Sequence, residues 1–352
     1  MSGTPTALEA SDFLRACRRQ PVTRRPVWFM RQAGRYMPEY RAIKARASFL
    51  EMCKTPDLAV EVTLQPVRAL GVDAAILFSD ILIPVEAMGV RVEFTPGPHL
   101  PEPVRSRSDV DRLRIVPPAE GVPFVLEAIR RLRRELPADV PLVGFCGAPW
   151  TIANYLVEGG GAKEFVRFKQ LCYEDSGTAT LLLDKLASVH AAYLQAQLAA
   201  GAQAVQIFDT WAGILDPDDY RRWALPPVQR MVREVRAAAP AAPILYFARD
   251  SGSLLEDLAT TGADVISLDW RVPLDRGRSV LGTGVAVQGN LDPAVLFAPW
   301  DEVRRRADVV LQRAGSAPGH IFNLGHGILV DTPVDTVRRL VDHVHAATAR
   351  AI

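Results

Sequence analysis

The sequence predicts an α/β protein of the (β/α)8 TIM-barrel class, because eight short apolar runs alternate with helix-like segments along its 352 residues. Most of these runs are almost continuously hydrophobic, which is typical of parallel strands covered on both faces. A barrel of this kind accommodates about 200 to more than 400 residues, so residues 1–352 are expected to form a single domain. The strands are expected at residues 26–30, 74–78, 141–146, 204–208, 243–247, 264–268, 285–289 and 320–324.

The segments between the strands carry signals for helix starts. Thr or Asp followed by Pro supplies an N-cap oxygen and a favourable first helical residue. This pair occurs at Thr55-Pro56, Asp216-Pro217, Asp292-Pro293 and Thr332-Pro333. After the last pair, VDTVRRLVDHVHAA spaces apolar residues three and four apart, which predicts a closing helix on the barrel wall.

Two segments depart from a minimal barrel. Residues 1–25 precede the first strand and are expected to form a helical prefix. Residues 81–117 follow the second strand and contain the short strand-like run VRVEF and the proline-rich TPGPHLPEPV. This long excursion is expected to rim or cover a functional site.

Composition excludes several classes of protein. A net charge of +1 argues against a nucleic-acid binder with a broad basic face, and no apolar run approaches the roughly 18 residues of a membrane span. The N-terminus lacks a basic start followed by an apolar stretch, so we expect a cytoplasmic protein. Four widely spaced cysteines, none in a CxxC pair, are expected to be buried free thiols without a metal.

Polar and glycine-rich sequences follow all eight predicted strands. In barrels of this class the chemistry lies at the carboxyl ends of the strands, so these exits predict an active site there. The exits, in order, read RQAGRYMPEYR, SDIL, GAPWT, DTWAG, ARDSG, DWR, NLDP and GHG.

The first exit places two arginines close together. Arg31 and Arg35 flank Gln32, Ala33 and Gly34, whose small members allow the backbone to approach a ligand while two guanidinium groups face it. This arrangement suits a polyanion. The alternative is one structural salt bridge and one solvent-exposed arginine.

Four further side chains lie at or near strand exits. Asp80 leaves a buried strand, where its carboxylate could stabilise a cation, or it could cap the next segment. His326 stands between two glycines and could reach a ligand or be a structural histidine. Tyr155 precedes three glycines, which suggests a mobile loop carrying a substrate-contacting phenol, although a core tyrosine explains it equally well. Thr210 offers a hydroxyl at the fourth exit.

Several common motifs are absent from the sequence. The glycines at 159–161 lack the spacing of a phosphate-binding loop, and Gly282-Thr283-Gly284 lacks the rest of a dinucleotide fingerprint. Neither GxSxG nor HExxH occurs. No nucleotide cofactor is therefore implied, and hydrolase and zinc-enzyme functions lose support.

Together the motifs resemble the uroporphyrinogen decarboxylase family, in order and over nearly the whole chain. They are WFMRQAGRYMPEYR, ILFSDIL, GFCGAPWT, YLVEGGG, FDTWAG, QGNLDP and FNLGHGI, of which RQAGRYMPEYR is the most specific. Two positions depart from the pattern of some members: Trp211 stands where they carry His, and Lys44 fills a basic position of the first loop.

The resemblance implies a (β/α)8 barrel, typically a homodimer, that works without a metal or prosthetic group. The implied reaction converts uroporphyrinogen III into coproporphyrinogen III, in which four acetate side chains become methyl groups and four CO2 are released. Eight substrate carboxylates account for a need for arginines. The substrate positions carried over are Arg31, Gln32, Ala33, Gly34, Arg35, Asp80, Tyr155, Thr210 and His326.

The resemblance also implies roles for individual residues. Asp80 would lie beneath the macrocycle, stay ionised, accept the pyrrole N–H bonds and stabilise a cationic intermediate. Arg31 would be both carboxylate clamp and candidate acid, although a group with a pKa above about 12 is a poor proton donor. Arg35 would be a clamp, and Tyr155, Thr210 and His326 would orient the carboxylate side chains.

Two alternatives accompany this hypothesis. A methyltransferase of the related barrel superfamily, working with a corrinoid partner, would need zinc bound by His-x-Cys and a second Cys at strand ends, and no such trio is present. A non-catalytic tetrapyrrole-binding protein would keep the arginines without turnover. The presence of Asp80 beside both arginines argues against it.

Overall fold

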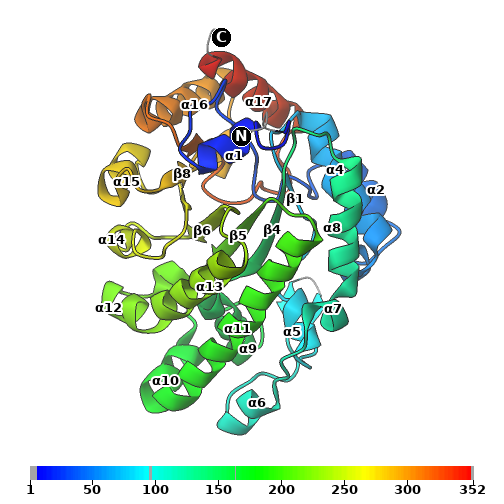
Figure 1. The fold of residues 1–352 in the computed structure, drawn as a ribbon, viewed down its shortest axis with the longest axis vertical. Helices are drawn as coiled ribbons and strands as arrows, with labels where there is room; N and C mark the ends of the chain where they lie inside the picture. The colour runs from blue at the N-terminus through cyan, green and yellow to red at the C-terminus, as the bar shows by residue number, and fades with distance from the viewer. Residues whose placement is uncertain (1–5, 95–96, 163, 350–352) are drawn as a thin grey trace, which may run out of the picture.

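A parallel sheet curled into a barrel forms the centre of the molecule (Figure 1). The computed structural model describes residues 6–94, 97–162 and 164–349. The seven strands are hydrogen-bonded in the order β1-β4-β5-β6-β7-β8-β9, and the central ones are completely buried. Their bounds are Ala75–Ile76 (β1), Leu142–Gly147 (β4), Ala204–Asp209 (β5), Ile244–Ala248 (β6), Val265–Leu268 (β7), Ala286–Gln288 (β8) and His320–Ile321 (β9).

The predicted first strand closes the barrel without forming a regular strand. Within residues 26–30, Val27 makes a single parallel bridge to Phe322, while its carbonyl oxygen accepts a 2.7 Å bond from the Asp73 N–H. The Val27 N–H donates at 2.7 Å to the carboxylate of Asp73, where a ladder would use a main-chain carbonyl. The eighth barrel segment lies where it was predicted. Its hydrogen bonding is irregular because the Asp73 side chain replaces a main-chain acceptor.

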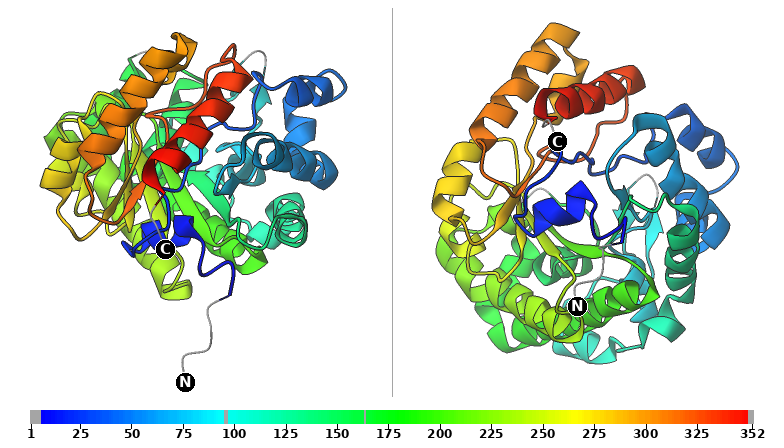
Figure 2. Two further views of the ribbon diagram at one scale, coloured as in Figure 1. Left: turned by 90° about the horizontal axis from the view of Figure 1, so that it is seen from above. Right: turned by 45° about the horizontal axis from the view of Figure 1, so that its top comes forward.

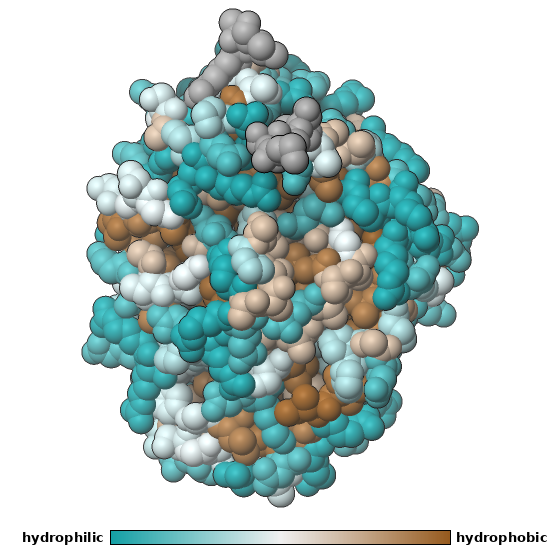
Figure 3. Space-filling view, in the orientation of Figure 1, coloured by the Kyte–Doolittle hydropathy of each residue, from teal (hydrophilic) through white to brown (hydrophobic). Residues whose placement is uncertain are grey.

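Helices form a ring outside the strands, as both views in Figure 2 show. Hydrophilic residues cover most of the face seen in Figure 3, with hydrophobic patches between them. No helix in the described ranges is long and apolar enough to cross a membrane. The α-helices are Asp12–Cys17 (α1), Pro38–Lys44 (α2), Phe49–Lys54 (α3), Pro56–Leu70 (α4), Ile83–Ala87 (α5), Arg107–Arg112 (α6), Pro118–Gly121 (α7), Pro123–Glu135 (α8), Pro149–Glu158 (α9), Val166–Glu174 (α10), Ser176–Ala200 (α11), Pro217–Asp219 (α12), Leu225–Ala238 (α13), Leu255–Leu258 (α14), Leu274–Leu281 (α15), Trp300–Ala314 (α16) and Val334–Thr348 (α17). Short 3-10 turns span Ala212–Ile214 (η1) and Pro293–Phe297 (η3), and a π-helical turn spans Tyr220–Ala224 (η2).

Two of the four predicted side-chain caps are confirmed and two are wrong. The Asp216 side chain accepts bonds from the first turn of α12, and that of Asp292 accepts one from Ala294. Thr55 is the N-cap of α4, as predicted, but its side chain makes no capping bond, and its N–H donates to the Glu51 carbonyl at the end of α3. Thr332 is one residue too early, since Pro333 is the N-cap of α17.

Within residues 6–25, the described part of the N-terminal prefix, only α1 is helical. This short helix lies at the amino ends of the strands, where Arg18 Nη2 donates to the carbonyl of Ala241 at 3.5 Å, just before β6. The next residue, Arg19, packs on Gly319 at the start of β9, so closely that a Cβ there would be 3.0 Å from Arg19 Cγ. The prefix therefore covers the end of the barrel opposite the strand exits (Figure 2).

The excursion after β1 lies along α9. It contains α5, an antiparallel pair of Glu93–Phe94 (β2) and Pro98–His99 (β3), and α6. The Leu100 N–H donates to the carbonyl of Gly159 at 2.9 Å, and Val104 N–H to that of Leu156 at 2.9 Å. The segment thus rims the carboxyl end of the barrel beside α9, as the sequence predicted.

The barrel interior is filled by side chains. The Trp28 indole N–H donates to Gln288 Oε1 at 2.8 Å, and the Gln288 amide donates to Ser267 Oγ at 3.0 Å. A cavity of only about 10 Å³ remains beside these side chains. The core is therefore a closed floor, and any ligand site lies above it at the strand exits.

Candidate active site

Arg31 lies at the exit of the closing segment in a left-handed backbone conformation, with φ +61°. This conformation is uncommon for a residue other than glycine and is characteristic of ligand sites and switch regions. The side chain packs directly over Gly327 in the last exit loop, where an added Cβ would be 2.5 Å from Arg31 Cδ. The absence of a side chain at 327 therefore makes room for the Arg31 guanidinium.

The rest of the first exit loop has mixed roles. Gln32 is completely buried, and its amide accepts from Phe29 N–H at 3.0 Å and donates to Ala74 O at 3.1 Å, so it ties the closing segment to β1. Ala33 and Gly34 are partly buried beside it. Arg35 is exposed. Burial raises the pKa of Tyr40, and the charge of Arg35 lowers it by a smaller amount.

Asp80 leaves β1 and is partly buried between the first exit and the excursion. Its Oδ1 accepts a 2.8 Å bond from the Leu82 N–H, as the capping alternative predicts, and its second oxygen is not used by this bond. Burial raises the pKa of Asp80 to about 6, while the Leu82 bond and the Arg31 charge lower it. The carboxylate is therefore mostly ionised at pH 7, close to Arg31.

Tyr155 lies on helix α9, and not on a loop as its glycine-rich neighbourhood suggested. Gly159, with φ +86°, ends α9 by donating its N–H to the Tyr155 carbonyl. The phenol is partly buried, 6.2 Å from the ring of Trp211 between centroids. Burial and the Asp80 charge raise the pKa of Tyr155, whereas Arg31 lowers it, which places this hydroxyl in the same cluster.

Thr210 follows β5 and is partly buried at the strand exit. The preceding residue, Asp209, is completely buried and holds the exit in place. Its carboxylate accepts from Thr151 Oγ1 at 2.6 Å and from the Tyr246 hydroxyl at 2.8 Å, and the Trp211 N–H donates to the same Thr151 oxygen at 3.1 Å. Burial raises the pKa of Asp209 to about 6, although the bonds from Thr151 and Tyr246 lower it.

His326 lies in the exit loop after β9, partly buried, with its ring 5.9 Å from that of Phe247. Its Nε2 is inaccessible to solvent and has no hydrogen-bond partner within the described residues. Burial, followed by the charges of Arg31, Arg249 and Arg271, lowers the pKa of His326 to about 3. The imidazole is therefore neutral at pH 7, so it can offer a ligand hydrogen bonds but no charge.

Arg249 and Arg271 are further candidate site residues that sequence reasoning did not single out. They follow β6 and β7, in the exits ARDSG and DWR, and both pair with Asp250. Their position at strand exits was the available signal. With 36 arginines in the chain, that signal alone did not distinguish them from surface residues.

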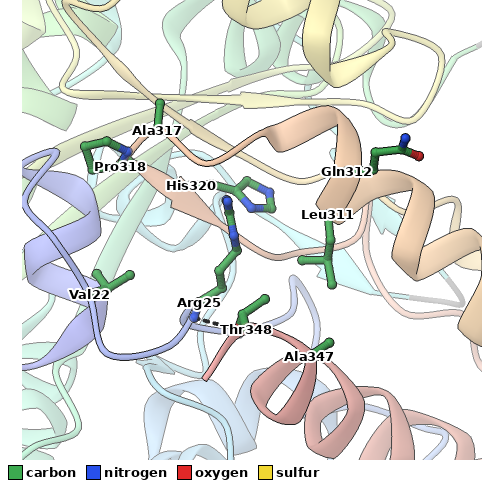
Figure 4. A pocket seen from close by; sticks show the side chains of 10 residues that line it. Val22, Arg25, Leu311, Gln312, Ala317, Pro318, His320, Ala347 and Thr348 are labelled. Atoms are coloured by element: carbon green, nitrogen blue, oxygen red, sulfur yellow. Dashed lines mark hydrogen bonds between the residues drawn. The ribbon is translucent and has the colours of Figure 1, made fainter. Parts of the chain in front are cut away.

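A separate cavity of about 340 Å³ lies at the amino end of the barrel (Figure 4). Arg25, His320 and Thr348 line it, and the Arg25 side chain extends towards the His320 ring. His320 begins β9, so this cavity is on the opposite side of the barrel floor from Asp80. It contains none of the predicted site residues.

No group of three His, Cys, Asp or Glu side chains in the described part of the chain could hold a metal ion. The four cysteines are buried free thiols, as predicted: Cys17, Cys53, Cys146 and Cys172.

Comparison with known proteins agrees with the motifs. Residues 8–347 match the family model described as uroporphyrinogen decarboxylase (URO-D). A uroporphyrinogen decarboxylase from Syntrophotalea carbinolica is 52% identical over 340 residues, which are 97% of this chain and 98% of that protein. One from Myxococcus xanthus is 55% identical over 333 residues, covering 94% of this chain and 95% of that protein.

Among solved structures, a methyltransferase from Methanosarcina mazei superposes with a TM-score of 0.79 over 98% of this chain and 99% of its own. The two sequences are 23% identical. At that level the likeness concerns the fold, and it confirms the predicted barrel class.

Proposed function

The chain belongs to the uroporphyrinogen decarboxylase family, and we propose that it decarboxylates the four acetate side chains of uroporphyrinogen III. The products would be coproporphyrinogen III and four CO2. The observation that carries the proposal is the position of Asp80, an ionised and partly buried carboxylate beside Arg31 at the strand exits. A partly buried acid beside guanidinium groups fits a substrate with many carboxylates and a cationic intermediate.

The reaction needs an electron sink, and we propose that the pyrrole ring supplies it. A proton adds to the ring carbon beside the one that bears the acetate, which makes the ring an electron-poor iminium. The C–C bond to the carboxylate then breaks, CO2 departs, and its electron pair restores a neutral exocyclic alkene. A second proton adds to the methylene carbon to form the methyl group, and loss of the first proton regenerates the pyrrole.

Asp80 is proposed to stabilise the cationic state by accepting the pyrrole N–H bonds. Its pKa of about 6 is consistent with this role, because the group is mostly ionised at pH 7 yet lies where burial penalises charge. A cation forming next to it would relieve that penalty. The stabilisation is therefore larger in the charged intermediate than in the neutral substrate, which is the requirement for catalysis.

The remaining side chains are proposed to bind and orient the substrate. Arg31 would clamp a carboxylate and is the candidate proton donor, with Arg35 as a second clamp. Tyr155, Thr210 and His326 would donate hydrogen bonds to carboxylates. Gln32 would act by holding the loop, since its amide is already engaged by Phe29 and Ala74.

We further propose a cytoplasmic homodimer. Family membership supports this assembly. Light scattering coupled to gel filtration would test it, because a 38.6 kDa chain should elute at twice that mass.

The decisive experiment incubates chelator-treated protein with uroporphyrinogen III under anaerobic conditions. The products are then oxidised and separated by carboxyl number. Species with seven, six, five and four carboxyl groups are expected in succession. Unchanged eight-carboxyl material from folded protein would contradict the proposal, and tight binding without turnover would identify a tetrapyrrole-binding protein instead.

A further inference from the structure

Three exit loops meet at the carboxyl ends of β6, β7 and β9. The ring of Phe247 in β6 lies 5.9 Å from that of His326, and Gly325 contacts the β7 exit so closely that a Cβ there would be 2.3 Å from the Trp270 nitrogen. These contacts bring Arg249, two residues after Phe247, and Arg271, directly after Trp270, to the side of His326. We call Arg249 and Arg271 the exit arginine pair.

Asp250 holds the exit arginine pair in place. Its two carboxylate oxygens lie 3.3 Å from Arg249 Nε and 2.8 Å from Arg271 Nη1. Asp250 has φ +57°, a left-handed conformation that Asp tolerates better than most residues. The Arg271 guanidinium also lies over the Trp270 ring, 4.2 Å from its centroid, so its position is set by two contacts.

Two acids, Asp250 and Asp269, balance the two arginines, and Asp269 lies 3.7 Å from Arg271 Nη1, but buried polar atoms without partners remain. Arg249 Nε is inaccessible to solvent and, despite its ion pair, makes no hydrogen bond within the described residues. Asp269, completely buried, is the second acid, and it accepts the N–H bonds of Ser251 and Arg271. His326 is kept neutral by this environment, with an unpartnered Nε2. Buried polar atoms without partners in a native protein commonly mark a position that a ligand or water completes.

The exit arginine pair is also accessible. The side chains of Arg249, Asp250 and Arg271 are 30%, 39% and 48% exposed, so a ligand entering at the strand exits can reach them. Gly213, in the exit of β5, packs directly against this loop, where its N–H donates to the Arg249 carbonyl at 3.1 Å and a side chain would not fit.

We infer that Arg249 and Arg271, together with His326, form a second carboxylate-binding subsite for the substrate side chains that keep their carboxyl groups. The inference rests on the proposed function. A cation that held a departing carboxylate would stabilise the substrate more than the transition state and so slow its loss. Permanent cations are better used on the propionates, which persist from substrate to product.

Charge-neutral variants Arg249→Gln and Arg271→Gln test the subsite. Each should raise KM for uroporphyrinogen III, and the inhibition constant of coproporphyrinogen III, by about tenfold or more, because each loses a hydrogen bond to a charged group. The single-turnover rate of the first decarboxylation should stay within about twofold of the wild-type rate. The variants lose binding energy that is equal in the substrate and in the transition state. Arg249→Lys and Arg271→Lys should recover part of the affinity. Arg305→Gln is the control, removing an arginine paired with Glu302 on the outer helix α16.

The outcomes separate this inference from the proposed function. Absence of turnover by the wild-type protein would overturn the function itself. Normal turnover with unchanged KM and product inhibition in both glutamine variants would overturn the subsite alone. A fall in the single-turnover rate without a change in KM would also overturn it, because the pair would then act on the reacting group.

Discussion

The Tyr246 hydroxyl donates a 2.8 Å hydrogen bond to Oδ2 of Asp209, a carboxylate completely buried at the exit of β5. The same hydroxyl lies 3.1 Å from that of Tyr220. Burial raises the pKa of Asp209 to about 6, and the Tyr246 bond lowers it. This pair anchors the strand exit that carries Thr210.

Tyr246→Phe should lower the free energy of unfolding by about 1 to 3 kcal/mol, because it leaves a buried carboxylate with one fewer donor. The folded-state pKa of Asp209 should rise further, so the ionised form becomes less favourable. The loss of stability should therefore be larger at pH 8 than at pH 5, as measured by denaturant unfolding. Tyr173→Phe, which removes an exposed hydroxyl bonded to Asp219, is the matched control and should change stability by less than about 0.5 kcal/mol. Equal losses in the two variants would contradict the role given to Asp209.

Asp80→Asn should abolish most turnover and yet stabilise the protein. The pKa of Asp80 is raised from 3.8 to about 6 on folding, so its ionisation opposes folding at pH values above that range. Removal of the charge should add about 1 to 3 kcal/mol at pH 8 and less at pH 5. Thermal unfolding at both pH values would measure this, with exposed Asp139→Asn as the control. A variant with normal turnover would remove Asp80 from the mechanism.

The acid limb of the pH–rate profile should reflect Asp80. Because the ionised carboxylate is the active form, kcat/KM should fall as the pH drops through about 6, the value of the Asp80 pKa. His326 has a pKa lowered to about 3, so it does not titrate in this range. His326→Gln should therefore raise KM but leave the midpoint of the acid limb in place. Disappearance of the limb in that variant would assign it to the histidine.

Gly327→Ala should displace Arg31. The new Cβ would be 2.5 Å from Arg31 Cδ, so the guanidinium must move, while the backbone at 327 accepts an alanine. We expect kcat/KM to fall by about tenfold to a hundredfold, as small displacements of positioning groups do, with little change in the unfolding temperature. Gly284→Ala adds the same methyl group where nothing lies within 4 Å and should be kinetically silent. Unchanged kinetics for Gly327→Ala would show that Arg31 is not needed in its present place.

Strand positions could be predicted from the sequence because the buried runs are almost continuously apolar, as in β6, and even β5 is interrupted only by Gln206 before it ends at Asp209. The irregular closing segment could not, since it depends on the Asp73 carboxylate replacing a main-chain acceptor. The predicted side-chain caps are missing at two threonines for local reasons. Thr55 also ends α3, and Thr332 lies one position before Pro333, the N-cap of α17.

The candidate site was predictable where a motif accompanied a strand exit, as for Arg31, Asp80 and His326. Tyr155 was placed on a loop because its glycines suggested mobility, whereas the first of them ends helix α9. Arg249 and Arg271 could not be singled out from the sequence, because their shared position beside Asp250 depends on contacts between loops that are far apart in sequence.

Asp73 binds more than the Val27 N–H: Arg24 lies 3.0 Å from one carboxylate oxygen, and His345 of α17 lies 2.6 Å from the other. The Asp73 side chain, just before β1, thus connects the first barrel segment to the last helix. Its contact with Val27 lies four residues before Arg31, and a second bond, from the Arg25 N–H to Thr348, also fastens this segment to α17. We therefore expect a change in α17 that removes His345 to loosen, through Asp73, the segment that leads to Arg31.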